Sequence, residues 1–567
     1  RYNHKKNTVR SVSVWPDNPM GHGAEDFKYR FQWNFPIFFS PHNPKKMYAA
    51  SNHLHATTNE GASWEVISPD LTRNDPAKLG SSGGPITQDN TSVEYYCTIF
   101  AAAESPLQEG LIYTGSDDGL VHVSTDAGAH WTNVTPKGWP EWMMVNSITP
   151  SKHDAGTCYV AGTRYKSGDY QPYIYKTSDF GKSWKRITNG IAEEHFTRVV
   201  REDLTQPGLL YAGTEAGLYV SFDDGAQWQS FQLNLPLVPI TDLALKNEDL
   251  IVATQGRSLW MIDDLSVLRQ LAQATKQKNY LFKPKDTYRL DGRARSGSTL
   301  SGTNHPGGVM VYYSLDNPEN QRISMHFMTQ NNDTIKSFHS DAKKDALPAK
   351  KGHNMMVWDL KGTGAERLDG MILWWASTEA PKVVPGTYKV VMRVGDEQQT
   401  QYFELHPDAN AETDLAGIQR QYDFIESVNQ TVDKAHKSIT KIRAINTQLK
   451  AFKKQYGALE TVADLVDKAS ALSASLTAIE EALYQTQNKS GQDPLNFPIK
   501  LTNKLAHLNS LVGMDDFPPT EQDVMVKDEL TAKINTELDA LDGLITTEIK
   551  IFNEAFNTLN LHYLIVE

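Results

Sequence analysis

Carboxylates in the first half of the chain are the residues that most directly suggest catalysis. A glycosidase needs two carboxyl groups roughly 5 to 10 Å apart, and one of them often has a raised pKa. Glu94 paired with Asp118 or with Glu215 could supply such a set. The alternative interpretation is that these side chains form ordinary ion pairs.

A second group of side chains suits noncovalent binding. Rigid aromatic rings contribute contact area at a low entropic cost, and arginine binds carboxylates through two parallel hydrogen bonds. No spacing marks Arg164, Arg198 and Arg257 as the triad that a sialidase needs, and ion pairing is the alternative role for them. The candidate ligand-binding residues are Asp89, Asn90, Tyr95, Trp139, Arg164, Arg198 and Arg257.

Other chemistries lack their sequence signatures. The chain has no HExxH motif and no Ser/His/Asp order typical of a hydrolytic triad. Its two cysteines, Cys97 and Cys158, stand apart from any Cys/His cluster, which excludes a structural zinc site or a disulfide scaffold. We therefore expect no metal ion and no cofactor.

Composition and charge narrow the class of protein. With 39% hydrophobic and 10% aromatic residues, the 567-residue chain has enough apolar material for several cores. A formal net charge of −12 argues against nucleic acid as a partner. The sequence also contains no run of 18 apolar residues, which a membrane-spanning helix would need. The opening residues RYNHKKNTVRSVSVWP lack an initiator Met and a signal-peptide pattern, so we expect a longer precursor.

A repeated eight-residue motif, called the box below, predicts the architecture of the first half of the chain. The pattern [Ser/Thr]-x-Asp-x-Gly-x-x-Trp occurs three times in full and a fourth time with Asn59 at the Asp position. The four tryptophans follow one another at intervals of 67, 53 and 44 residues. The pattern predicts a tight hairpin in which Asp accepts backbone hydrogen bonds, Gly takes a positive φ and Trp packs between sheets. The box residues are Asn59, Gly61, Trp64, Asp126, Gly128, Trp131, Asp179, Gly181, Trp184, Asp223, Gly225 and Trp228.

These repeats predict a β-propeller over residues 1–268, with about five blades and a strand remnant at Arg1 to Trp15. We expect closure of the propeller to need partners from an upstream segment. Each box lies between the third and outer strands of a blade, so the candidate residues above belong to loops on the opposite face. The same loops also contain Trp142, Asp169, Glu193, Glu194 and His195.

The four boxes carry a resemblance to a known family. They are similar to the Asp-box, or bacterial neuraminidase repeat, of sialidases, some endoglucanases and sortilin-type receptors. The stretches SSGGPITQDNTSVEYYCTIFAAAESP and VATQGRSLWMIDDL resemble large secreted bacterial propeller proteins described as sortilin-like or glycosyl hydrolase-like. The resemblance implies a location that is secreted, periplasmic or associated with the outer membrane of a Gram-negative bacterium.

The remainder of the chain predicts two further domains. After a linker at 269–287, short alternating runs that include NMMVWDL and MILWWAS predict an immunoglobulin-like β-sandwich over 288–407. Apolar residues then recur at spacings of three and four, which predicts an antiparallel helical bundle over 411–567 with three long helices and one shorter helix near 498–512.

Together these features favour a binding protein. We expect the propeller face opposite the boxes to hold a peptide or a glycan, while the C-terminal domains dock partners, including an envelope or outer-membrane protein through the helical tail. The alternative is a glycoside hydrolase that uses paired carboxylates.

Overall fold

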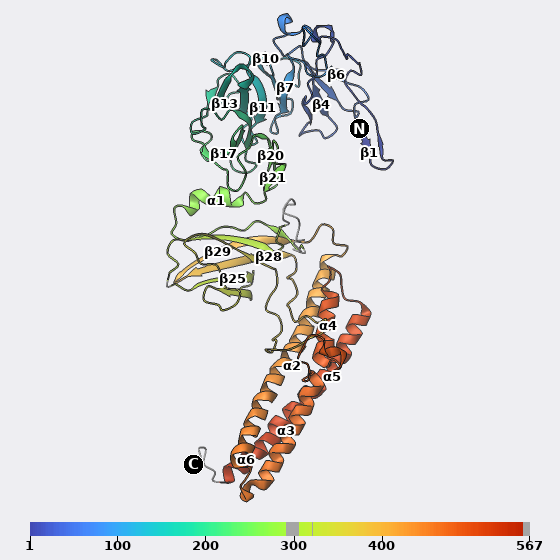
Figure 1. Ribbon diagram of the computed structural model, residues 1–567, viewed down its shortest axis with the longest axis vertical. Helices are drawn as coiled ribbons and strands as arrows, with labels where there is room; N and C mark the ends of the chain where they lie inside the picture. Colours follow the sequence, from blue (N-terminus) through green and yellow to red (C-terminus); the bar gives the residue numbers. More distant parts are fainter. Residues whose placement is uncertain (291–304, 320, 560–567) are drawn as a thin grey trace. The chain divides into compact units, whose positions relative to one another are not determined.

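The computed structural model describes residues 1–290, 305–319 and 321–559. Parts of the predicted sandwich and the end of the predicted bundle, at 560–567, lie outside the described residues. The chain divides into two compact units, Arg1–Arg269 and Gln270–Glu567, and each is described by itself (Figure 1).

The first unit contains five consecutive antiparallel sheets in which each strand pairs with its neighbour in sequence. This repeated meander makes the unit propeller-like. The first sheet is β3 (Ile37–Phe39), β4 (Met47–Ala50), β5 (Leu54–Thr57) and β6 (Glu65–Val66). The second is β7 (Ile99–Glu104), β8 (Ile112–Ser116), β9 (Val121–Ser124) and β10 (Thr132–Asn133). The third is β11 (Met144–Pro150), β12 (Cys158–Arg164), β13 (Asp169–Thr177) and β14 (Lys185–Arg186). The fourth is β15 (Thr197–Glu202), β16 (Leu210–Thr214), β17 (Gly217–Ser221) and β18 (Gln229–Ser230), and the fifth is β19 (Ile240–Lys246), β20 (Asp249–Thr254) and β21 (Leu259–Ile262).

The apolar cores of this unit lie between successive sheets. Tyr48 and Leu54 of the first sheet are buried with Ile99 of the second, and Val199 of the fourth is buried with Leu243 of the fifth. Successive sheets therefore share their apolar cores.

The four boxes fasten each sheet to the segment before it. The indole N–H of Trp131 donates to the carbonyl of Ile67 at 3.0 Å, and that of Trp184 donates to Val134 at 2.7 Å. Both acceptors directly follow the outer strand of the preceding sheet. Trp228 makes the same bond to Ile187, so these three tryptophans join neighbouring sheets.

The box glycines allow this close approach. Gly128 has φ +99°, and a Cβ added there would lie 2.5 Å from the carbonyl oxygen of Ile67. A side chain at this position would therefore push the preceding segment away and break the tryptophan bond. Asp126 completes the turn by accepting the backbone N–H of His130 at 2.9 Å.

The two ends of the sheet series differ from its middle. At the first box, Trp64 donates to the carbonyl of Val12, which follows the exposed hairpin of β1 (Tyr2–Asn3) and β2 (Thr8–Val9). The fifth sheet has three strands among the described residues, and its third strand exposes 70% of Leu259 and 60% of Met261. Third strands of the four-stranded sheets are mostly buried.

The second unit begins with a two-sheet sandwich. One sheet is β22 (Tyr280–Leu281), β24 (Val309–Leu315) and β27 (Gly352–Trp358). The other, in spatial order, is β23 (Thr287–Tyr288), β29 (Glu397–His406), β28 (Gly386–Val394), β25 (Ile323–Thr329) and β26 (Thr334–His339). Trp358 stacks on Phe327 with 4.4 Å between ring centroids and joins the two sheets in one core. The immunoglobulin-like character of the sandwich remains a prediction.

Two segments of this region differ from the sequence-based expectation. The predicted linker contains part of helix α1 (Ser266–Ala274) and the sandwich strand β22, because Tyr280 and Leu281 are buried between polar flanks. The expected strand MILWWAS is irregular instead. Its backbone is held by a helix, since Asn503 accepts the N–H of Trp374 at 2.6 Å and donates to its carbonyl at 2.9 Å.

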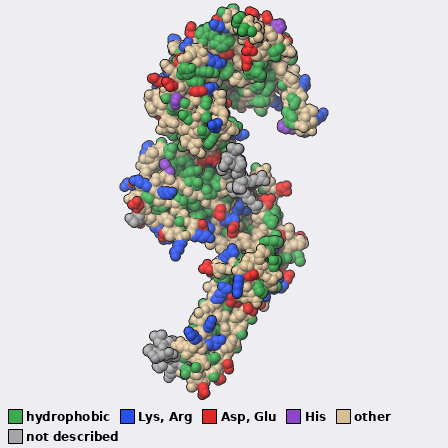
Figure 2. All heavy atoms as spheres, viewed as in Figure 1, with side chains coloured by type: hydrophobic (Ala, Val, Ile, Leu, Met, Phe, Trp, Pro, Cys, Tyr) green, Lys and Arg blue, Asp and Glu red, His purple; other side chains and the backbone are tan. Residues whose placement is uncertain are grey.

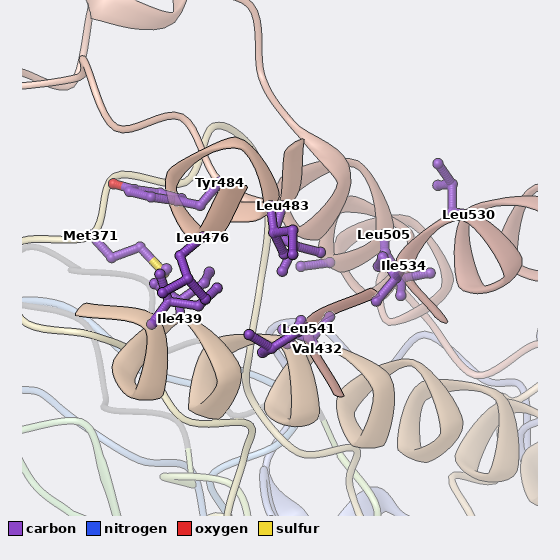
Figure 3. Close-up of a cluster of buried hydrophobic side chains, with 14 of the residues drawn as sticks. Met371, Val432, Ile439, Leu476, Leu483, Tyr484, Leu505, Leu530, Ile534 and Leu541 are labelled. Carbon is purple, nitrogen blue, oxygen red and sulfur yellow. The ribbon is translucent and has the colours of Figure 1, made fainter. Parts of the chain in front are cut away.

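The rest of the second unit is a bundle of long helices. Its helices are α2 (Leu415–Tyr456), α3 (Ala463–Leu483), α4 (Leu501–Val512), α5 (Glu521–Gly543), a π-helical turn (Leu544–Glu548) and α6 (Ile549–Thr558). Asp414 caps α2 by accepting the N–H of Gly417 at 2.7 Å, and Thr520 with Asp523 forms a capping box for α5. Figure 3 shows Ile439 beside Leu476 and Val432 beside Leu541, and all four belong to the shared core.

The surface of the helices is polar and mixed in charge. Figure 2 shows acidic and basic side chains interspersed along the visible face of the helical part. Among the described residues, no helix combines the length and apolar character needed to cross a membrane.

Candidate functional site

A cavity of about 960 Å³ lies in the first unit, at the end of the sheets opposite the boxes. All five sheets contribute to it through residues at or just before the start of their inner strands. Two connections between second and third strands also reach it, at Asp117 and at 164–167. The inner-strand contributions are 32–34, 94–96 with Phe100, Trp142 with Met144 and Asn146, Arg198 with Val199 and Arg201, and Thr241 with Asp242.

A β-bulge near the start of the inner strand recurs in four of the sheets. In β7, Ile99 pairs with Ser116 of β8. The next pair is Ala101 with Gly115, so Phe100 between them has no partner. A bulge turns its extra residue out of the normal alternation. The four residues at the bulges are Phe100, Asn146, Arg198 and Thr241, hereafter the bulge row, and all of them line the cavity.

Glycines on the second strands make room beside these bulges. A Cβ added to Gly115 would lie 2.3 Å from Cγ1 of Val145, and one added to Gly213 would lie 2.7 Å from Cγ2 of Ile240. Both neighbours belong to the inner strand of the next sheet. The glycines therefore let successive inner strands approach closely enough to form one wall.

Two arginines of the cavity wall are already paired. Arg198 donates from Nε and Nη2 to one oxygen of Glu215, at 2.8 and 2.6 Å. Arg201 donates to Asp242 at 2.8 Å and also to hydroxyl and carbonyl oxygens. These bonds fix the direction of both side chains.

Asp117 is the buried acid of the cavity wall. Its two carboxylate oxygens accept the backbone N–H and the hydroxyl of Thr98, at 2.9 and 2.7 Å. Burial raises the pKa of Asp117 to about 7, although the bonds from Thr98 act in the opposite direction. This carboxyl group is therefore partly protonated near neutral pH.

The short connection between β12 and β13 supplies a basic edge. A 3₁₀ turn (Tyr165–Ser167) follows Arg164, and Arg164, Tyr165 and Lys166 all line the cavity. The nearest acid to Arg164 is Asp169, at 3.8 Å from Nη1. The ring of Tyr165 stacks on Phe196 with 5.0 Å between centroids, which gives the turn a rigid base.

The first three sheets also contribute aromatic and acidic side chains to the cavity. Trp33 is 67% exposed, yet its indole N–H donates to Oε1 of Glu94 at 2.8 Å. The ring is thereby held in place while its surface stays open. Trp142 stacks on Tyr96 and has φ +60°, a strained backbone for a bulky residue.

Some of the sequence-predicted residues meet in this cavity and others do not. Glu94, Tyr95, Arg164 and Arg198 line it, as does Trp142. Tyr95 is largely structural, since it is buried and its hydroxyl donates to the carbonyl of His22 at 2.9 Å.

The predicted catalytic carboxylates do not lie together in the structure. Asp118 is buried away from the cavity and accepts the backbone N–H of Arg73 at 2.8 Å, because adjacent turn residues point in different directions. Its neighbour Asp117 lines the cavity in its place. Glu215 lies outside the lining and orients Arg198.

Four predicted ligand-binding residues have other surroundings. Asn90 ties its loop to the carbonyl of Gly21 at 3.2 Å, and Trp139 is buried against Tyr175 in a core. Asp89 and Arg257 are exposed outside the cavity lining.

Six residues of the cavity escaped the sequence analysis, namely Phe100, Asn146 and Thr241 of the bulge row together with Trp33, Tyr165 and Lys166. A signal for the bulges was present, since second strands repeat a Gly-[Ser/Thr] pair at Gly115-Ser116, Gly162-Thr163 and Gly213-Thr214. Trp33 had no such signal, because it precedes its strand outside any repeat.

No family model matches the chain, and no curated protein matches it. Three solved structures show a loose likeness. A GH74 enzyme of Niastella koreensis is 11% identical, with a TM-score of 0.27 over 40% of this chain and 29% of that one. The GH74 xyloglucanase of Xanthomonas campestris is 14% identical, with a TM-score of 0.31 over 64% of this chain and 57% of that one. YCF48 bound to a D1 peptide is 16% identical, with a TM-score of 0.28 over 42% of this chain and 65% of that one.

The chain thus spans less than two thirds of each of these three structures. Such low TM-scores carry no argument about function. The propeller-like fold rests on the chain's own strand order and on the three tryptophan bonds between successive sheets.

Proposed function

We propose that the cavity at the end opposite the boxes binds a peptide or a glycan without cleaving it. The observation that carries this proposal is the bulge row, which points four different side chains from four sheets into one cavity. Fixed arginines and an open tryptophan ring add directional and apolar contacts, which is the composition of a recognition site.

The carboxylates favour binding over hydrolysis. Of the three predicted catalytic candidates, only Glu94 lines the cavity. Its two carboxylate oxygens accept hydrogen bonds from Trp33 and Thr91, at 2.8 and 3.3 Å. Asp118 and Glu215 are engaged by neighbouring groups of the fold.

A glycoside hydrolase remains the second candidate because of Asp117. Hydrolysis of a glycosidic bond uses one carboxyl group with a raised pKa and one that is ionised. Asp117, whose pKa is raised to about 7 by burial, lines the same cavity as Glu94. These two residues would be the acid and the second carboxylate of that reaction.

The wider setting of the binding site is also a proposal. The resemblance of the boxes and of the flanking motifs supports a secreted, periplasmic or outer-membrane-associated protein. The sandwich and the long helices would then dock envelope partners.

The test incubates the full chain with a panel of oligosaccharides and peptides and scores retention and cleavage separately by mass spectrometry. The test variant is Trp33→Ala, and the matched control is Trp375→Ala, since Trp375 is 73% exposed in the second unit. Retention that is lost only in Trp33→Ala supports the binding site.

A third variant, Glu94→Gln, separates the two candidate functions. If the original chain cleaves a member of the panel and Glu94→Gln does not, the function is hydrolysis and the binding proposal is wrong. Retention that is equal in both tryptophan variants would contradict the proposed location.

A further inference from the structure

The charges around the cavity are unevenly compensated. Arg198 and Arg201 have close acidic partners, whereas Arg164 is 3.8 Å from Asp169. Asp169 in turn accepts the hydroxyl of Tyr173 at 2.7 Å.

Lys166 adds a second weakly compensated charge. It is exposed and makes no hydrogen bond or ion pair with another described residue. The basic edge made by Arg164 and Lys166 is therefore where the cavity can best accept an anionic group.

The polar lining beside this edge suits hydroxyl groups. Asn34, Asn146, Thr163 and Thr241 bring amides and hydroxyls to the same cavity, and each can donate and accept. Asn146 is already oriented, since its Oδ1 accepts the hydroxyl of Thr163 at 2.7 Å. Such a lining matches a ligand with many hydroxyl groups.

The backbone of the cavity wall argues against an extended peptide added as a strand. Strand addition needs a regular row of unpaired N–H and C=O groups along an edge. Here four inner strands are interrupted by bulges at the level of the cavity. The wall therefore offers side chains in place of a regular backbone edge.

Trp33 provides a flat apolar surface at the same cavity. Its bond to Glu94 fixes the ring, and 67% of the residue stays exposed. A sugar ring can lie against such a surface without ordering a flexible side chain first.

From these features we infer that the ligand is an acidic oligosaccharide, with a sugar ring on Trp33 and a uronate carboxylate at the basic edge of Arg164 and Lys166. This inference rests on the proposed function and names the class of its ligand. The carboxylate would bind through charge-assisted hydrogen bonds, and the bulge row would contact the hydroxyl groups.

The experiment measures binding to the full chain by isothermal titration calorimetry. The probes are hexamers of galacturonic, mannuronic and guluronic acid, each compared with its carboxyl-reduced form. We expect at least one acidic hexamer to bind about 10-fold or more tightly than its reduced form, and to weaken as salt is raised.

The variants locate the effect. In the double variant Arg164→Gln/Lys166→Gln, affinity for the acidic hexamer should fall about 10-fold or more, toward that of the reduced form. Lys182→Gln/Lys185→Gln, at two exposed lysines in and directly after the third box, is the charge-matched control and should bind as the original chain does. Unchanged circular dichroism verifies that the double variant is folded.

Three results would overturn the inference. Equal affinity for the acidic and reduced hexamers would refute carboxylate recognition while leaving the proposed binding function intact. Tighter binding of a hexaglutamate peptide would refute the glycan class. Absence of binding to every uronate hexamer would also refute it, and the broader panel with Trp33→Ala would then judge the proposed function alone.

Discussion

The two ends of the propeller-like sheets repeat in different ways. At the box end the same side chains recur, and each tryptophan bonds to the residue after the preceding outer strand. At the cavity end only the bulge recurs, and its residue is Phe, Asn, Arg or Thr. Repeated side chains thus mark contacts that are the same between successive four-stranded sheets, whereas a repeated geometry with varied side chains marks a surface that faces a ligand.

The largest effect should come from a box tryptophan. Trp228 is only 1% exposed, so Trp228→Ala should lower the free energy of unfolding of the fourth sheet by about 3 to 5 kcal/mol. Urea titration of the full chain, followed by hydrogen exchange in β15 to β18, measures it. Trp33→Ala should leave the hydrogen-exchange rates of these amides unchanged and should weaken only ligand binding. Equal destabilisation by Trp228→Ala and Trp33→Ala would contradict the distinction between a structural box end and a ligand-binding cavity end.

Next in size is the loss of a glycine beside a bulge. Gly115→Ala would place a Cβ 2.3 Å from Val145, so we expect about 1 to 3 kcal/mol of destabilisation and weaker ligand binding. Thermal unfolding and calorimetric titration measure the two effects. Gly80→Ala is the control, because an added Cβ there meets no atom within 4 Å. Unaltered binding in Gly115→Ala would show that the bulge is not set by this glycine.

The pH dependence of stability should differ in sign between the two ends. Hydrogen bonds from the backbone and ring of His130 lower the pKa of Asp126 from 3.8 to about 2. Its stabilising contribution is present above the unfolded pKa and is lost as pH falls toward 2. Burial raises the pKa of Asp117 from 3.8 to about 7, so its folded state binds more protons and stability falls as pH rises between those values.

Thermal unfolding between pH 2 and pH 8 tests both signs. Asp126→Asn should reduce the loss of stability at acidic pH. Asp117→Asn should remove the decline in stability between about pH 4 and pH 7. Profiles that match the original chain in both variants would contradict the assigned roles.

The smallest effect should come from the bulge row itself. Thr241 lines the cavity and is exposed, so Thr241→Ala should change stability by less than about 0.5 kcal/mol. Loss of one hydrogen bond to a ligand would weaken binding about 2- to 10-fold. Calorimetric titration with the ligand identified by the panel measures this change, and a stability loss above that of Gly115→Ala would reverse the proposed division of roles.

Much of the architecture could be predicted because local patterns encode it. The repeated box specifies a turn within eight residues, and the helical spacing after Asp414 agrees with α2. The run MILWWAS was misjudged because Met371, Leu373 and Ala376 pack against helices without joining a sheet, and an apolar run alone does not distinguish these two kinds of burial.

The site was harder to predict because it depends on side-chain direction. Asp117 and Asp118 are adjacent in sequence, yet only Asp117 lines the cavity. Glu215 has the right chemistry but binds Arg198, and this contact between a turn and a strand has no signature in the sequence of either. Trp33 becomes part of the site only through its bond to Glu94, 61 residues away.

The tryptophan bonds between sheets also determine how the first unit should respond to tension. A pull from its C-terminal side would first detach the fifth sheet, which breaks no box bond among the described residues, and would then meet Trp228, Trp184, Trp131 and Trp64 in turn. The intervals of 44, 53 and 67 residues correspond to about 150 to 230 Å of released chain for each step. The unit should therefore lengthen in discrete increments, each of which follows the breaking of one tryptophan hydrogen bond.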